Sequence, residues 1–481
     1  MKRRRRTHTN PMATTRSLSA IGLDFGTRAC RAVLVDCGTG AGAGTVLGVT
    51  AGSAFRHGEA IQPRHLDRLA LLAAGGELPF APDDAASLSD DEAGWALQHP
   101  NDWIDAASDA LAELSTATGG FAGTRVVGLA TTFTSCTVLP VVRRGGDGLV
   151  PLCFAEPDLA LRPHAWAKLW KHHSRGAAAA ADTLTAVLRA GDGGDSGDGR
   201  DGGAGGALAY RDDPHHWLRR YGGVVGLEWL FPKLLEIYRE DKDVYARADT
   251  FIEAGDWVTS RLTARGVEGL DTEEARRLDM VDAQCLYRST CQAGFKGLWC
   301  QDTRQYLPTR SMLDRAEPGF AGALDKLAYG ASGEAEEAGE AGGWGGEGTD
   351  PHRHRHVSPG SSVGFFLAGG AAAERGGGSD DDLSTPTRRS AALEPLLPCL
   401  AQAASLGPGF VALAEAARRE NQPIAVSASS IDAHAGAVGV GAEPGTMVLV
   451  LGTSACYMMS AEQRSEGSDG GAFETRFLSS A

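Results

Sequence analysis

The chain of 481 residues is predicted to be an α/β protein. Short apolar runs, which are typical of buried strands, alternate with a segment of helical periodicity, and this alternation is characteristic of α/β folds. A strand–turn–strand pattern also occurs twice, once near each end of the sequence. The length exceeds that of one ordinary domain, so we expect two or three.

The first strands are predicted near the beginning of the chain. Ile21–Asp24 is an apolar run that ends in a turn at Gly26, and a second run, Arg31–Asp36 (RAVLVD), follows. Two such runs joined by a short turn that contains glycine predict a β-hairpin. Val126–Thr132 (VVGLATT) has the composition of a further buried strand.

A helix is predicted between this hairpin and the third strand. Asn101 is a suitable N-cap residue, and two consecutive glycines at 119 and 120 mark the end. Between these positions the apolar residues recur at helical spacing, namely at Ile104, Ala107, Leu111 and Leu114.

The composition is that of a globular enzyme, with 42% apolar and 22% charged residues. The net charge of −15 argues against a nucleic-acid partner, because phosphate backbones need a basic surface. Nine cysteines without CxxC pairs are typical of reduced thiols inside a cell. No apolar run approaches the roughly 20 residues that span a bilayer, so we expect no membrane partner.

The first residues, 1–18, form a basic and hydroxyl-rich leader (MKRRRRTHTNPMATTRSL). Two interpretations remain open. The leader is either an organellar transit segment or an extension that precedes a start at Met12. The second interpretation predicts a cytoplasmic protein.

Two segments are predicted to be low-complexity insertions. Residues 191–206 (GDGGDSGDGRDGGAGG) have the composition of a flexible linker. Residues 329–390 are rich in Gly, Glu, Ser and Asp, and we expect them to bury too little apolar surface to fold. We therefore expect both segments to be exposed.

The repeated pattern suggests two related halves. GTRAC at residues 26–30 aligns with GTSAC at residues 452–456, and an apolar strand precedes each copy. A tight glycine turn lets backbone amides approach an anion, and Thr or Ser adds a hydroxyl donor. Asp24 precedes the first copy, where one carboxylate can hold Mg²⁺ through water. The alternative is that Asp24 only bonds its own loop.

Three further places carry side chains suited to phosphoryl transfer to a polyol. Asp432, in SSIDAHAGAVGVG, can act as a general base or as a helix N-cap. Ser135 and Cys136 follow the strand that ends at Thr132, and ligands bind at the carboxyl ends of parallel strands. Lys296, in AGFKGLW, can bond a sugar oxygen or extend along the surface.

Together these motifs resemble the FGGY carbohydrate kinases. IGLDFGT, IDAHAGAVGVG and VLGTS are similar to the phosphate- and base-bearing segments of that family. The L-ribulokinase branch is indicated by five further segments, FTSCTVLP, PHAWAKLWKHH, RYGGVVGLEWLFPK, FIEAGDW and CQAGFKGLW. LWKHH stands where the related D-ribulose kinases carry an acidic segment. The resemblance extends from about Ile21 to Cys456.

The resemblance implies two actin-like, RNase H-like domains around a cleft that closes on sugar and ATP. It implies that Asp432 is the catalytic base, that Lys296 contacts the sugar, and that the backbone near Ser135 and Cys136 lines its pocket. The residues that would face the phosphates are Asp24, Gly26 and Thr27 on one side and Gly452, Thr453 and Ser454 on the other. The implied cofactors are ATP and Mg²⁺, the latter held by Asp24 through water.

We therefore expect a sugar-binding kinase domain at residues 19–441 and the beginning of a nucleotide-binding domain at residues 442–481, which is incomplete because few residues remain. The expected reaction converts L-ribulose to L-ribulose 5-phosphate, with the ketopentose and ATP as small-molecule partners. A homodimer is compatible with the sequence. The alternatives are a truncated, non-catalytic sugar-binding or regulatory protein, and a kinase for another sugar such as xylulose or D-ribulose.

Overall fold

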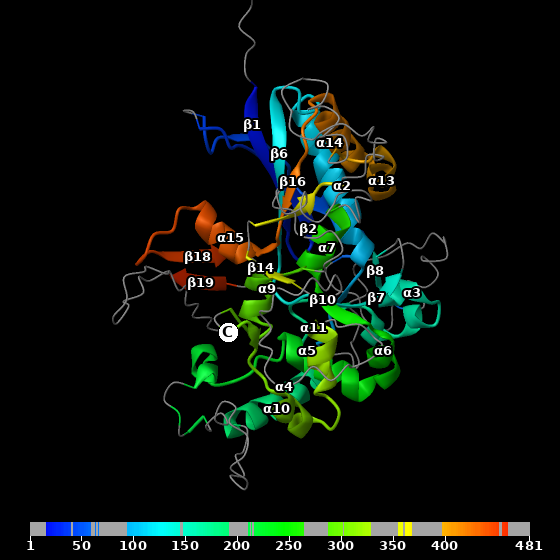
Figure 1. Cartoon of the computed structure of the whole chain (residues 1–481), viewed down its shortest axis with the longest axis vertical. Helices are drawn as coiled ribbons and strands as arrows, with labels where there is room; N and C mark the ends of the chain where they lie inside the picture. The colour runs from blue at the N-terminus through cyan, green and yellow to red at the C-terminus, as the bar shows by residue number, and fades with distance from the viewer. Residues whose placement is uncertain are drawn as a thin grey trace, which may run out of the picture.

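The structure is a computed structural model. It describes residues 16–39, 42–58, 63, 66, 94–144, 148–191, 210–211, 213, 216–263, 287–301, 303–328, 355–358, 361–367, 397–451 and 455–459. Within this part of the chain, a larger mixed β-sheet, a smaller antiparallel one and the helices packed on them form most of the molecule (Figure 1). The α/β class predicted from the sequence is therefore confirmed.

The larger sheet has the strand order of an RNase H-like domain. Its strands are β1 (Ser17–Phe25), β2 (Ala29–Asp36), β3 (Val46–Val49), β4 (Ser53–Ala54), β6 (Thr124–Phe133), β15 (Ser362–Phe365), β16 (Ala425–Ser427) and β17 (Ser430–Ile431). The order is β3-β2-β1-β6-β16-β15, with β17 also beside β6 and β4 beside β2. Strand β2 runs antiparallel to β1 and β3, whereas β6 is parallel to β1 and β16 is parallel to β6. The first five strands thus follow the RNase H-like order 3-2-1-4-5.

Strands β1 and β2 form the predicted hairpin. Side chains alternate between the two faces of a strand, and in β1 the buried set is Ser19, Ile21, Leu23 and Phe25. The ring of Phe25 stacks on that of Phe133 at the end of β6, with 5.1 Å between centroids. The same apolar face that the sequence pattern predicts therefore enters the first core.

Helices α2 (Pro100–Ala117), α13 (Leu400–Leu406) and α14 (Pro408–Arg419) pack together beside this sheet (Figure 1). The predicted helix is present as α2, and its four predicted apolar residues are buried. Its N-cap is His99, so the prediction of Asn101 was wrong. Pro100 has a fixed φ suited to the first helical position, which lets the helix begin before Asn101.

Helices α2 and α14 approach so closely that one contact needs glycine. A Cβ atom added at Gly409 would lie 1.9 Å from the carbonyl oxygen of Ser108. The Gly409 amide instead donates to Ser108 Oγ at 3.1 Å. This hydrogen bond from a backbone amide to a side-chain hydroxyl joins segments about 300 residues apart in the sequence.

The smaller sheet belongs to a second core. Its strands are β5 (Leu97–Gln98), β7 (Val138–Arg144), β8 (Gly148–Pro151), β9 (Ala167–Lys168) and β10 (Thr250–Glu253). The helices that follow these strands or pack near them are α3 (Leu152–Ala155), α4 (Arg175–Ala190), α5 (Leu230–Glu240), α6 (Lys242–Arg247), α7 (Ala254–Leu262), α10 (Arg310–Ala316) and α11 (Gly322–Ala328). Three short 3₁₀ helices are η3 (Leu159–Leu161), η4 (Pro163–Ala165) and η5 (Trp217–Tyr221).

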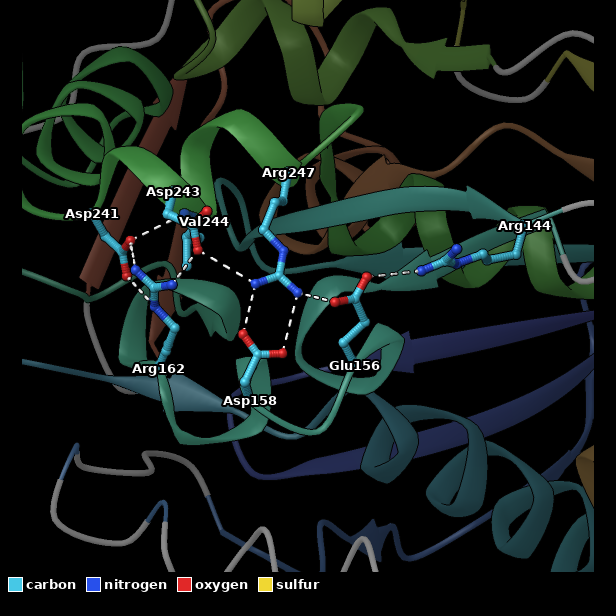
Figure 2. Close-up of polar contacts among 8 residues, drawn as sticks. All are labelled: Arg144, Glu156, Asp158, Arg162, Asp241, Asp243, Val244 and Arg247. Atoms are coloured by element: carbon cyan, nitrogen blue, oxygen red, sulfur yellow. Dashed lines mark hydrogen bonds and ion pairs between the residues drawn. The ribbon is translucent and has the colours of Figure 1, made fainter.

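A network of ion pairs on the surface fastens α6 to the chain between β8 and β9 (Figure 2). Arg247 contacts Asp158 at 2.6 Å, and Arg162 donates from Nε to Asp241 at 3.0 Å. Asp241 also caps α6 by accepting from the Val244 amide. Exposed pairs each contribute about 1 kcal/mol or less, so the network mainly fixes how these segments lie.

Part of the predicted insertion at residues 329–390 belongs to the fold. Strand β14 (Arg355–Val357) pairs with β11 (Tyr287–Ser289), and β15 lies at the edge of the larger sheet. Val363 and Phe366 enter the first core. This corrects the prediction for these residues, because averaging composition over 62 positions hides the short apolar run SVGFFL. The rest of that insertion, and residues 192–206, lie outside the described residues.

The last described elements are α15 (Asp432–Gly439) and the hairpin of β18 (Met447–Leu451) and β19 (Ala455–Met459). In Figure 1 they lie together to one side of the larger sheet. Both copies of the repeated pattern are therefore antiparallel hairpins, but their turns differ in length, because Phe25 pairs with Cys30 whereas Leu451 pairs with Ala455.

The remaining short elements lie next to one another. Helix α9 (Thr290–Phe295) contacts β12 (Trp299–Cys300), and β12 pairs with β13 (Gln305–Tyr306). None of the described helices combines the length and apolar character needed to cross a membrane.

Candidate active site

Two of the predicted carboxylates lie at the same edge of the larger sheet. Strands β1, β6 and β17 are parallel neighbours, and both Asp24 and Ser430 are level with Thr132 of β6. Asp432 follows β17 directly. Since neighbouring strands lie about 4.8 Å apart, the backbones of Asp24 and Ser430 are separated by about two strand spacings, roughly 10 Å, and Asp432 lies two residues beyond Ser430.

Asp24 is held from the neighbouring strands rather than by its own loop. Thr132 Oγ1 donates to Asp24 Oδ1 at 2.8 Å, and Arg31 Nη1 lies 3.5 Å from Asp24 Oδ2. The side chain is 46% exposed. A single, partly exposed carboxylate fits a water-mediated contact to Mg²⁺, which keeps most of its hydration shell.

The turn after β1 is tight and is supported from the second core. The Gly26 amide donates to the Ala29 carbonyl at 3.0 Å and closes the turn. Thr27 is buried, and its Oγ1 accepts from the indole nitrogen of Trp170 at 3.1 Å. Its carbonyl accepts from Gln98 Nε2. The hydroxyl hydrogen of Thr27 remains able to donate to an anion.

Asp432 is the first residue of α15, and the N-cap position belongs to Ile431, whose side chain makes no capping bond. Asp432 Oδ1 accepts from the next amide, that of Ala433, at 2.7 Å. Burial raises the pKa of Asp432 to about 6, and the negative charge of Asp24 adds to this, whereas Lys296 acts in the opposite direction. The carboxylate therefore lies in the combined field of the other two predicted residues.

Lys296 ends α9 as its C-cap residue and is not a surface lysine. Its side chain is 15% exposed, and its ammonium lies 3.2 Å from Glu228 Oε2 and above the ring of Trp170. Trp170 thus contacts both Thr27 and Lys296, which places the turn predicted to face the phosphates and the predicted sugar contact on the same side of the molecule.

Ser135 and Cys136 are buried between β6 and β7. Cys136 has a φ of 68°, an uncommon conformation for a residue with a side chain. Ser135 Oγ makes no hydrogen bond to any described residue. A buried hydroxyl without a partner costs free energy, so this position is suited to a polar ligand.

Two buried charged residues near this loop were not predicted. Lys233 of α5 donates to the carbonyls of Cys136 and Leu169 at 2.6 and 2.9 Å, and burial lowers its pKa to about 8. The Glu253 carboxylate faces the thiol of Cys136 and accepts no hydrogen bond from a described N–H or hydroxyl group. Burial, and then the nearby Asp256, raise the pKa of Glu253 to about 8. The only signal in the sequence was a charged residue inside an apolar run, as in WLFPK and FIEA.

The second glycine turn, with Gly452, Thr453 and Ser454, lies outside the described residues. In the strand that follows it, burial raises the pKa of Cys456, and the charges of Asp432 and Lys296 act on it in opposite directions. Strand β18, which pairs with β19, contacts α15, the helix that begins at Asp432.

Two other groups of described side chains have the composition of metal ligands. In the first, the rings of His57 and His99 are stacked at 4.3 Å and 19°, so their in-plane lone pairs do not converge on one ion, and His57 Nδ1 contacts Asp102 at 2.6 Å instead. In the second group, which includes Glu236, a lysine ammonium lies where a metal ion would bind. Lys168 Nζ lies 3.1 Å from Glu236, which also contacts His172.

Comparison with known proteins gives relatives among the ribulokinases. The chain is 28% identical to ribulokinase from Shouchella clausii over 447 residues, which is 93% of this chain and 54% of that protein. It is 33% identical to ribulokinase from Mycolicibacterium smegmatis over 318 residues, or 66% of this chain and 43% of that protein. No protein-family model matches.

Solved structures of other sugar kinases are also similar. A xylulose kinase from Rhodospirillum rubrum has a TM-score of 0.46 and 16% identity, covering 93% of this chain and 56% of that one. The glycerol kinase of Plasmodium falciparum with ADP has a TM-score of 0.45 and 9% identity, covering 92% and 54%. The chain spans about half the length of the curated relatives it matches. By sequence, it is similar to ribulokinases over nearly all of its own length.

Proposed function

We propose that the protein takes part in ATP-dependent phosphorylation of a ketopentose, converting L-ribulose to L-ribulose 5-phosphate. The observation that carries the proposal is the position of Asp432, a carboxylate of raised pKa at the same sheet edge as Asp24 and within the field of Lys296. The similarity to ribulokinases supports the choice of a ketopentose over other acceptors.

In the proposed chemistry, Asp432 transfers the proton and the other residues bind the two substrates. Asp432 accepts the proton of the terminal hydroxyl as that oxygen attacks the γ-phosphorus of ATP, and the bond between that phosphorus and the β–γ bridging oxygen breaks so that ADP leaves. A pKa of about 6 leaves the carboxylate ionised at pH 7 while keeping it a useful base. General-base assistance of this kind contributes roughly 10²–10⁴-fold to the rate.

The other residues bind and orient. Lys296 donates to a sugar oxygen, and the buried Ser135 hydroxyl and the Cys136 backbone contact the sugar. The turn at Gly26 and Thr27 directs its donors to the phosphates. Asp24 holds the water shell of Mg²⁺, which would neutralise charge on the phosphates when bound. The turn at Gly452–Ser454 is proposed to face the same phosphates from β18–β19.

The test is Asp432→Asn, which preserves the shape of the side chain but removes its ability to accept the proton. We expect kcat with L-ribulose to fall roughly 10²–10⁴-fold, with KM for the sugar little changed. Asp182→Asn, at an exposed position of α4, is the matched control. Near-normal kcat in Asp432→Asn would show that Asp432 is not the base.

Calorimetry measures sugar binding separately from turnover. We expect L-ribulose to bind more tightly than D-ribulose or D-xylulose, both to the parent chain and to Asp432→Asn. Binding without turnover in the parent would favour a sugar-binding or regulatory role. Preference for D-xylulose would change the substrate, and the absence of both binding and turnover with all three sugars would refute the proposal.

A further inference from the structure

Helix α15 is weakly held by its own residues. Its eight residues are half-buried or exposed, with none fully enclosed, and the N-cap residue Ile431 provides no capping side chain. Its sequence, DAHAGAVG, offers mostly small side chains. Asp432 stands at the first position of this helix, so the forces that fix its orientation must come from other elements.

The segment of β11 and α9 provides these contacts. Ser289 Oγ donates to the Ser429 carbonyl at 2.5 Å, and Gln292 Nε2 donates to the Ser430 carbonyl at 3.4 Å. Both carbonyls belong to the chain that leads into Asp432. Because Lys296 ends the same helix, α9 contacts the backbone before Asp432 at one end and carries the predicted sugar contact at the other.

Cys291 of α9 contacts both sides of Asp432. Its sulfur accepts from the amide of Ile431, one residue before Asp432, at 3.5 Å. The same sulfur lies 3.1 Å from Nδ1 of His434, two residues after Asp432. The His434 ring packs edge-on against Phe295, at the other end of α9. The thiol therefore spans the first turn of α15.

We infer that Cys291 is a positioning residue for Asp432, holding the first turn of α15 through Ile431 and His434. The inference rests on the proposed function, in which Asp432 is the base. A thiol suits this place because it can accept from the amide while donating its hydrogen to the imidazole. Alanine would leave the Ile431 amide and the His434 ring nitrogen without this partner, so the turn would move or admit water.

The groups that face Asp432 determine how replacing Cys291 should change the pKa of Asp432. Besides Cys291 and His434 on either side, they are Asp24 from β1, Lys296 from α9 and Cys456 from β19. Burial is the largest cause of the raised pKa of Asp432. Water entering at Cys291 would therefore lower that pKa, without altering the contacts of Lys296 with Glu228 and Trp170.

The kinetic test compares Cys291→Ala and Cys291→Ser, with Cys399→Ala as a control of similar exposure at α13. A misplacement of about 1 Å costs up to about 10²-fold, so we expect kcat in Cys291→Ala to fall by about 10- to 100-fold with KM for the sugar little changed. The acidic limb of the kcat profile should also move to lower pH. Serine retains a donor and an acceptor and should recover most of the loss.

A second measurement is independent of turnover. The carboxyl carbon of Asp432, labelled with ¹³C and assigned by its loss in Asp432→Asn, reports its pKa by titration. We expect a lower midpoint in Cys291→Ala than in the parent and in Cys399→Ala. An unchanged midpoint would overturn the positioning role even if no kinase activity were found, whereas a shifted midpoint in an inactive parent would refute only the proposed function.

Discussion

Asp24 and Asp432 carry the same type of group at one sheet edge, but their surroundings differ. Asp24 is nearly half exposed and contacts a threonine and an arginine, whereas Asp432 is more enclosed and has a raised pKa. A hydrated carboxylate suits contact with the water shell of a cation, and an enclosed one suits proton transfer. The two residues should therefore fail in different ways when they are replaced.

Replacing Asp24 by alanine should weaken the use of Mg·ATP. The change removes the proposed contact to the metal's water shell and leaves Asp432 in place, so KM for Mg·ATP should rise while the affinity for L-ribulose stays the same. Titrating Mg²⁺ at fixed ATP in kinetic assays would measure the first effect, and calorimetry with the sugar the second. An unchanged Mg²⁺ dependence would contradict the assignment of Asp24.

The sequence predicted Asp24, Lys296 and Asp432 because each stands in a recognisable motif, and the structure brings them to one side of the molecule. It did not predict Lys233. A lysine in an amphipathic helix normally points to water, and Lys233 is buried only because two carbonyls from distant loops accept its hydrogen bonds. Such partners depend on tertiary structure and leave no local signal.

At the scale of elements, local pairing was predictable and long-range pairing was not. The β1–β2 hairpin and α2 follow from neighbouring residues and their periodicity. Strands β15 and β16 have four and three residues, and both lie more than 200 residues after β6 in the sequence. Strand β16 pairs with β6, and β15 pairs with β16. Segments this short carry almost no periodicity, so the order of the sheet could not be derived from them.

Gly409→Ala tests the contact between α2 and α14. The new Cβ would overlap the Ser108 carbonyl, so the helices must move apart. Overpacking of this kind typically costs about 1–3 kcal/mol of the free energy of unfolding, which urea denaturation would measure. Gly123→Ala is the control, because a Cβ there meets nothing within 4 Å. Equal stability of the two variants would show that α14 can shift at no cost.

At the scale of the whole molecule, histidines of lowered pKa make a contribution to stability that acid removes. Burial lowers the pKa of His99 and His434 to about 4 and that of His172 to about 3. Between these values and the ordinary 6.5, the unfolded chain binds protons that the folded chain does not. The contribution of these histidines to the free energy of unfolding should therefore be largest above pH 6.5 and fall as the pH drops toward 4, whereas the raised pKa values of Glu253, Asp256 and Asp432 act in the opposite direction.

His99→Phe should reduce this loss. His99 packs against Phe154 and Trp166, so phenylalanine suits its surroundings and cannot be protonated. The His99 contribution amounts to at most about 3 kcal/mol between pH 6.5 and 4. The urea midpoint at pH 7 minus the midpoint at pH 4.5 should therefore be smaller in the variant than in the parent. Equal differences would mean that His99 is protonated in the folded protein.

The buried group around Glu236 restricts how this part of the chain can evolve. Glu236 meets Lys168, His172 and the Ser174 hydroxyl, all from one short segment. Losing one member of a buried ion pair strands a charge at a cost of about 3–5 kcal/mol, while exchanging the whole set for apolar residues of similar volume is often neutral. Among homologous chains these positions should consequently change together, as a covarying set, rather than one at a time.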